Sequence, residues 1–140
     1  MAPFRWLCAA ALIAALSPVA LAQELPTFRF GMWEFVSTLD NGPGSKPQVI
    51  TVSRCTDPTE EMKRQNDKLA QVGCSISPPA RSGKVYSFSS SCSIHGKATE
   101  FKSALTAESD SAYSLRTESR QGAETAVESM KARRTGDCAK

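Results

Sequence analysis

The stretch VYSFSSSCSI, residues 85–94, decides the fold because its apolar and polar side chains alternate along the chain. One set of alternate positions holds Tyr86, Phe88, Cys92 and Ile94, and serines occupy the other set. A repeat of two residues is that of a β-strand with one buried face, since successive side chains point to opposite faces. The stretch therefore predicts a half-buried strand.

Three more segments of this kind follow, and turn-forming residues separate them. Phe101 and Leu105 are in register in the first, Tyr113 and Leu115 alternate with polar residues in the second, and the third contains Val127 and Met130. The expected turns are His95-Gly96, residues 108–111 and Gln121-Gly122. Strands joined by tight turns at such spacing pair with their neighbours, so the sequence predicts a four-stranded antiparallel meander.

Two strands are expected upstream of the meander. The segment FRFGMWEFVSTL, residues 28–39, has apolar side chains on both faces, which indicates a central strand or one that is kinked at Gly31. A loop over residues 41–44 leads to a short second strand, residues 49–52. We therefore expect a mainly β (α+β) fold, an antiparallel, curved six-stranded sheet.

One helix is expected, and it begins after Asp57. Asp57 is a suitable N-cap, Pro58 suits the first helical position, and Glu60 completes a capping box. Good helix formers follow, and Gly73 is a suitable C-terminal stop. Its apolar face would hold Met62, Leu69 and Val72. A single weakly amphipathic helix leaves part of a six-stranded sheet uncovered.

The first 22 residues are typical of a secretory signal peptide. Arg5 gives a positive start, residues 6–16 are almost wholly apolar, and Pro18 precedes the small residues Ala20 and Ala22. The apolar run is too short to span a bilayer. We expect cleavage after Ala22, a single disulfide-bonded β-rich domain over residues 23–140, and a periplasmic location without a transmembrane segment.

The cysteines left after that cleavage form an even set, which in an exported domain indicates disulfides. They are Cys55, Cys74, Cys92 and Cys138. The expected helix separates Cys55 from Cys74 by roughly 20 Å, whereas a disulfide needs Cα atoms within about 7 Å. Two connectivities remain: Cys74–Cys92 with Cys55–Cys138, or Cys55–Cys92 with Cys74–Cys138. A bend at Pro78-Pro79 and Ser82-Gly83 favours the first.

Charge and composition exclude some partners and cofactors. Without Arg5, the remaining residues carry 16 basic and 14 acidic side chains, and the two signs are interspersed. No basic stripe with aromatic residues occurs, so nucleic acid is not expected. With one histidine and no Cys-x-x-Cys pair, neither a metal site nor another cofactor is expected.

The order of several short motifs resembles a known family. Gly31-Met32-Trp33-Glu34 opens a strand, Cys55-Thr56-Asp57-Pro58 leads into a helix, and Gly136-Asp137-Cys138 ends the segment. With Cys74 and Cys92 between them, this arrangement is similar to the proteobacterial exported family called domain of unknown function 3617. The resemblance spans residues 28–138. It implies a disulfide-bonded, β-rich periplasmic domain and no particular activity.

Two functions of different class follow as hypotheses. The first is a non-catalytic periplasmic binding or envelope-associated protein, whose incompletely covered sheet holds a small apolar ligand or an envelope protein. Its candidate lining residues are Trp33, Phe28, Phe30 and Phe35. The alternative is a small hydrolase-like enzyme in which His95 activates Ser91 or Ser93. We favour the first, and assign no catalytic, cofactor-binding or metal residue.

Overall fold

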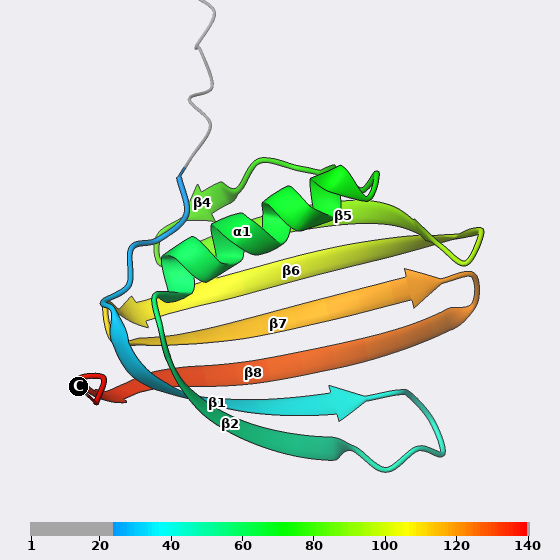
Figure 1. The fold of residues 1–140 in the computed structure, drawn as a ribbon. Helices are drawn as coiled ribbons and strands as arrows, with labels where there is room; N and C mark the ends of the chain where they lie inside the picture. The colour runs from blue at the N-terminus through cyan, green and yellow to red at the C-terminus, as the bar shows by residue number, and fades with distance from the viewer. Residues whose placement is uncertain (1–23, 140) are drawn as a thin grey trace, which may run out of the picture.

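The computed structural model describes residues 24–139, and they form an eight-stranded antiparallel sheet with one helix (Figure 1). The fold is mainly β, as the alternating segments predict. In chain order the elements are β1 (Gly31–Asp40), β2 (Gln48–Thr56), α1 (Pro58–Gln71), β3 (Ser75–Ile76), β4 (Ala80–Ser82), β5 (Val85–Ile94), β6 (Lys97–Ser109), β7 (Ala112–Gln121) and β8 (Glu124–Gly136).

The strand order across the sheet is β2-β1-β8-β7-β6-β5-β3, and β4 pairs with β5 further along. Strands β5 to β8 form the expected meander. Strand β1 then pairs along the last strand of that meander, with Phe35 opposite Ala132. Helix α1 follows the edge strand β2 and leads to β3 at the opposite edge, so it carries the chain across one face of the sheet.

The expected number of six strands is wrong, because the chain between α1 and β5 adds β3 and β4. These two short strands flank Pro78-Pro79. They pair with β5 through Ser75 opposite Ser91 and Arg81 opposite Tyr86. The second strand is also longer than expected and reaches from Gln48 to Thr56. Both differences have one cause: a neighbouring strand offers backbone partners to segments whose own side chains show no clear alternation.

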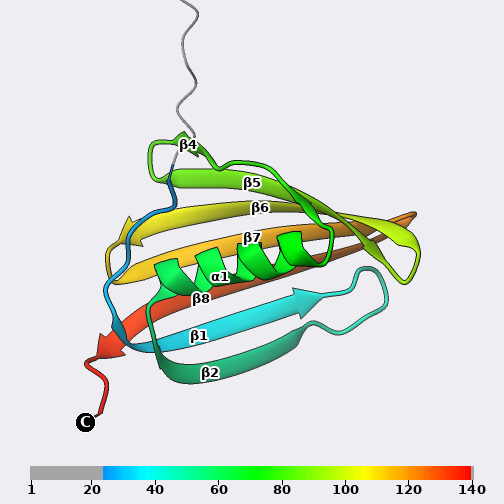
Figure 2. The same ribbon diagram turned by 45° about the horizontal axis from the view of Figure 1, so that its top comes forward.

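The core lies on the face of the sheet that α1 crosses. Figures 1 and 2 show the strands curving around the helix, which lies over the concave side. Trp33 and Leu105 are fully buried there. The ring of Phe28 stacks on Tyr113 with centroids 4.6 Å apart and meets Trp33 edge-on at 5.9 Å. The serines at 87, 89, 91 and 93 are exposed on the outer face, as the alternation predicts.

Helix α1 begins as the sequence predicts. The carboxylate of Asp57 accepts hydrogen bonds from the backbone N–H groups of Thr59 and Glu60 at 3.0 and 3.2 Å. At the other end Val72 is the C-cap residue and is 77% exposed, so it is not part of the apolar face. Gly73 adopts the positive φ of 88° that ends many helices.

Two disulfides close the structure, Cys55–Cys138 and Cys74–Cys92. This is the connectivity that the bend at Pro78-Pro79 favours. The first bond joins the end of β2 to the segment after β8, with Cα atoms 5.5 Å apart. The second joins the segment after α1 to β5, with Cα atoms 4.4 Å apart. The second bond therefore holds the C-terminal end of α1 to the sheet.

The expected signal peptide, residues 1–22, lies outside the described residues. Among residues 24–139, no helix has the length and apolar character needed to cross a bilayer.

Candidate ligand-binding cleft

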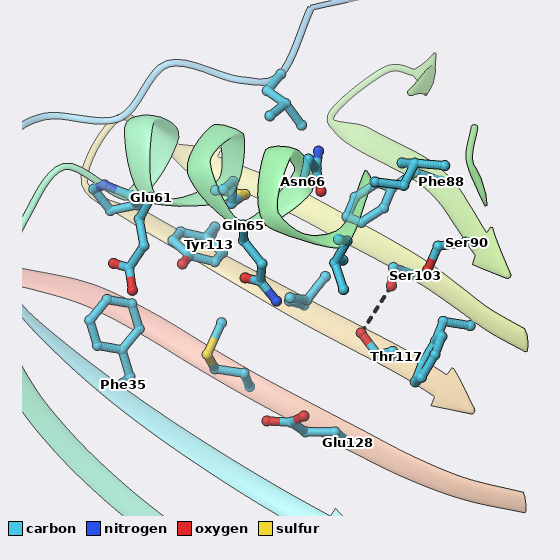
Figure 3. Close-up of a pocket in the computed structure, with 18 of the residues that line it drawn as sticks. Phe35, Glu61, Gln65, Asn66, Phe88, Ser90, Ser103, Tyr113, Thr117 and Glu128 are labelled. Atoms are coloured by element: carbon cyan, nitrogen blue, oxygen red, sulfur yellow. Dashed lines mark hydrogen bonds between the residues drawn. The ribbon is translucent and has the colours of Figure 1, made fainter. Parts of the chain in front are cut away.

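A cleft of about 440 Å³ lies between α1 and the concave face of the sheet (Figure 3). Its helix side is formed by Glu61, Met62, Gln65, Asn66 and Leu69. The opposite wall is formed by residues of β1 to β3 and β5 to β8. Leu25 contributes from the segment before β1. The buried residues of α1, Pro58 and Thr59, lie in its first turn, and the cleft extends along the helix from Pro58 to Leu69.

Apolar side chains form much of the wall on the sheet side. They come from six strands, one from each, and are Phe35, Ile76, Phe88, Phe101, Leu115 and Met130. Met62 of the helix and Met130 both pack against the buried core. Methionine side chains adapt their shape to what they contact, so this wall can adjust to ligands of different outline.

A charged network closes the cleft near the start of α1. The guanidinium of Arg54 lies 2.5 Å from a carboxylate oxygen of Glu61, and the hydroxyl of Thr56 donates to the other oxygen at 2.9 Å. Arg54 also lies over the ring of Phe35, 4.2 Å from its centroid. These contacts join the edge strand β2 to the first turns of the helix. Since Arg54 is already paired, the network gives this end no free positive charge.

Tyr113 contributes a phenol to the same end of the cleft. Burial raises the pKa of Tyr113 to about 12, and the nearby carboxylate of Glu61 acts in the same direction while Arg54 opposes it. The hydroxyl is therefore protonated throughout the physiological pH range. A neutral phenol in an apolar wall can donate one hydrogen bond to the polar end of a ligand.

Uncharged polar groups and one carboxylate line the rest of the cleft. Figure 3 shows Gln65 and Asn66 on the helix, with Glu128 across from them on β8. The hydroxyls of Ser103 and Thr117, on neighbouring strands, hydrogen-bond to each other at 3.0 Å. The arrangement is therefore apolar with a few placed hydrogen-bonding groups, which is the usual composition of a small-molecule site.

The four aromatic residues expected to line a site lie in three different places. Phe35 lines the cleft. Phe28 and Trp33 are buried in the core beside Tyr113, where the indole N–H of Trp33 donates to the carbonyl of Arg29 at 2.9 Å. Phe30 is 60% exposed, away from the cleft lining.

The residues of the hydrolase hypothesis lie outside the cleft. Ser91 and Ser93 are exposed on the outer face of β5, and His95 is exposed in the turn that follows, at a φ of 51°. None of the hydrogen bonds among residues 24–139 joins His95 to either serine. Within the same part of the chain, no cluster of three or more His, Cys, Asp or Glu side chains is arranged to hold a metal ion.

Sequence reasoning missed most of the cleft. Gln65, Asn66, Ser103 and Thr117 are polar residues on elements that were otherwise predicted, and nothing in their spacing distinguishes them from a solvated face. One signal did point here: the prediction that one helix leaves part of the sheet uncovered. The cleft is where that uncovered surface lies.

The chain matches the model of a known family. The family model described as "Protein of unknown function (DUF3617)" matches residues 26–138, which confirms the resemblance drawn from the sequence. No curated protein and no solved structure matches the chain at a significant level.

Proposed function

Because the chain belongs to the family of proteins of unknown function DUF3617, we propose from its own geometry that it is a non-catalytic binding protein that holds a small apolar or amphipathic ligand between α1 and the sheet. The observation that carries the proposal is the open cleft of about 440 Å³ under a helix that is fixed at both ends. Sites for small molecules typically measure roughly 300–1,000 Å³.

The chemistry of the walls favours a ligand with an apolar body and a small polar end. Phe35, Leu115 and Met130 offer apolar surface, and burying such surface contributes about 25 cal/mol for each Å². The phenol of Tyr113 and the amides of Gln65 and Asn66 can hydrogen-bond to a polar group. An envelope protein that inserts an apolar side chain into the cleft is the second kind of occupant in the proposal.

We also propose that the protein binds its ligand in the periplasm. The secretory character of residues 1–22 supports export. The two disulfides support an oxidising compartment, where such bonds form and persist.

Native mass spectrometry of the protein purified from periplasm tests the proposal. We expect a species heavier than the polypeptide by the mass of a retained small molecule, which is lost at higher collision energy. The polypeptide mass should correspond to cleavage after Ala22 with both disulfides formed. A preparation that carries no retained molecule and binds no environment-sensitive apolar dye would contradict the binding function.

A matched pair of variants locates the binding. Ser103→Trp places an indole inside the cleft, whereas Ala104→Trp places the same group on the exposed outer face of the same strand. We expect dye binding to fall at least about tenfold in Ser103→Trp, which corresponds to about 1.4 kcal/mol. It should stay close to wild type in Ala104→Trp. Equal binding by the two variants would show that the dye does not use the cleft.

A further inference from the structure

The outer edge of β2 is long and unprotected. Strand β2 pairs with β1 along its whole length without a register shift, and no strand of residues 24–139 lies on its other side. In Figures 1 and 2 it forms one rim of the sheet, with no other element beyond it. Natural edge strands are usually kept from pairing by a lysine, a proline, a bulge or short length. The segment QVITVSRCT, residues 48–56, has none of these features.

The same strand exposes a run of aliphatic side chains. Val49, Ile50 and Val52 are 65%, 56% and 42% exposed. These residues have high β-propensity, and the only charged side chain of the strand, Arg54, is already paired with Glu61. An open edge that is rich in aliphatic side chains and carries no charge over residues 48–53 is suited to adding another strand.

The opposite edge of the sheet cannot add a strand in the same way. It is formed by β3 and β4, of two and three residues, and Pro78-Pro79 lies between them. In the described part of the chain, each molecule has only this one long open edge. When two β2 strands pair with each other, neither molecule keeps an open edge for a third copy. Such an association closes at two copies and does not continue into a filament.

We propose that β2 is the interface of a homodimer, in which the β2 strands of two copies pair antiparallel about a two-fold axis at Thr51. The two sheets then form one continuous sheet. Side chains that face each other across the axis must lie on the same face of the sheet, so residues of the same parity are opposed. In this register Ile50 faces Val52 of the second copy, and Val49 faces Ser53 of the second copy.

The register follows from what each choice of axis brings together. With the axis at Thr51, the two copies contribute four aliphatic side chains, Ile50 and Val52 from each, to one cluster on the concave face. Moving the axis to Ile50 sets Val52 opposite Gln48, and moving it to Val52 sets Ile50 opposite Arg54. Each of those two axes leaves one aliphatic pair on this face, the axis residue with its own copy, whereas the axis at Thr51 gives two pairs of Ile50 with Val52. Residues 48–53 carry no charge. Pairing two copies along them therefore brings no like charges together, and the second copy is not repelled.

The oligomeric state of the oxidised protein in solution tests the interface. We expect sedimentation velocity to give about twice the monomer mass for wild type, and the monomer mass for Ile50→Lys, with dimer affinity at least about tenfold weaker. Ile94→Lys is the matched control, since Ile94 is a partly exposed aliphatic residue at the far end of β5. It should dimerise as wild type does. A monomeric wild type, or equal dimerisation of the two lysine variants, would overturn the proposal.

Cross-linking tests the register separately. Two opposed cysteines at the axis have Cα atoms about 4.5–5.5 Å apart, within reach of a disulfide. Thr51→Cys should therefore form a covalent dimer under mild oxidation, because residue 51 faces itself. Ser53→Cys, on the same face of the same strand, faces Val49 of the second copy and should stay monomeric on a non-reducing gel. Cross-linking of Ser53→Cys as fast as Thr51→Cys would show that the register is wrong.

Discussion

Gly31 occupies the most crowded backbone position among the described glycines. A Cβ atom added there would lie 2.5 Å from the carbonyl oxygen of Gly136 and would also meet the guanidinium of Arg134. Arg134 is fixed in place, since its Nε donates to the carbonyl of Phe30 at 2.9 Å and its guanidinium pairs with Asp137. The absence of a side chain at Gly31 thus lets β1 approach the end of β8.

Gly31→Ala is expected to destabilise the fold by about 1–3 kcal/mol, since the added methyl group must displace backbone or a held guanidinium. Gly136→Ala is the matched control, because a Cβ at Gly136 meets no atom within 4 Å. Urea unfolding of both variants, followed by circular dichroism, measures the difference. The explanation fails if the two substitutions change the free energy of unfolding equally.

Thr59 shows how a helix and the segment before β1 are joined. Its hydroxyl is buried, accepts from the backbone N–H of Phe28 at 2.9 Å and donates to the carbonyl of Pro26 at 3.0 Å. Two otherwise unpaired backbone groups are satisfied by one side chain in the first turn of α1. The residues leading into β1 therefore depend on the helix for their position.

Replacing Thr59 with valine keeps the shape and removes the hydroxyl. We expect Thr59→Val to cost about 1–3 kcal/mol, because both backbone groups are left buried without partners. Thr125→Val, at an exposed position on β8, should change stability by less than about 0.5 kcal/mol. Thermal unfolding of the two variants under the same conditions distinguishes them, and a Thr59→Val variant as stable as Thr125→Val would refute the role of the hydroxyl.

The elements with local signals could be predicted from the sequence. The cap formed by Asp57 and Pro58 located the start of α1, and the alternation of residues 85–94 located β5. Strands β3 and β4 could not be predicted, because two or three residues beside Pro78-Pro79 carry no repeat. They are strands only because β5 offers them hydrogen-bonding partners.

The candidate site was predicted in outline and not in its residues. Weak coverage by one helix indicated an open apolar surface, and Phe35 belongs to it. Gln65 and Thr117 were not found, because a polar side chain that faces a cleft follows the same pattern as one that faces water. Their role depends on how far α1 stands from the sheet, and this distance is set by contacts between segments remote in the sequence.

At the scale of the whole molecule, the two disulfides constrain the chain over very different lengths. Cys55–Cys138 spans 83 residues and Cys74–Cys92 spans 18. The chain-entropy account gives about 4.5 kcal/mol for the longer loop and about 3 kcal/mol for the shorter. Both values are large beside a net stability of about 5–15 kcal/mol.

Paired serine variants test this difference. Cys55→Ser with Cys138→Ser should lower the free energy of unfolding by about 1 kcal/mol more than Cys74→Ser with Cys92→Ser. The second pair should have the larger effect on dye binding, because Cys74–Cys92 holds the end of α1 against β5 beside the cleft. Urea unfolding and dye titration measure the two effects, and a larger stability loss for the second pair would contradict the expectation.

The pairing of β1 with β8 also constrains how the molecule is assembled. The β1–β2 hairpin comes first in the chain, yet the inner partner of β1 is β8, roughly a hundred residues later, and contacts between such distant segments form late in folding. The hairpins of β5 to β8 have only short turns to close and are the natural folding nucleus. Until that nucleus forms, the side of β1 that pairs with β8 has no partner, and an unpaired strand edge of this kind is prone to aggregate.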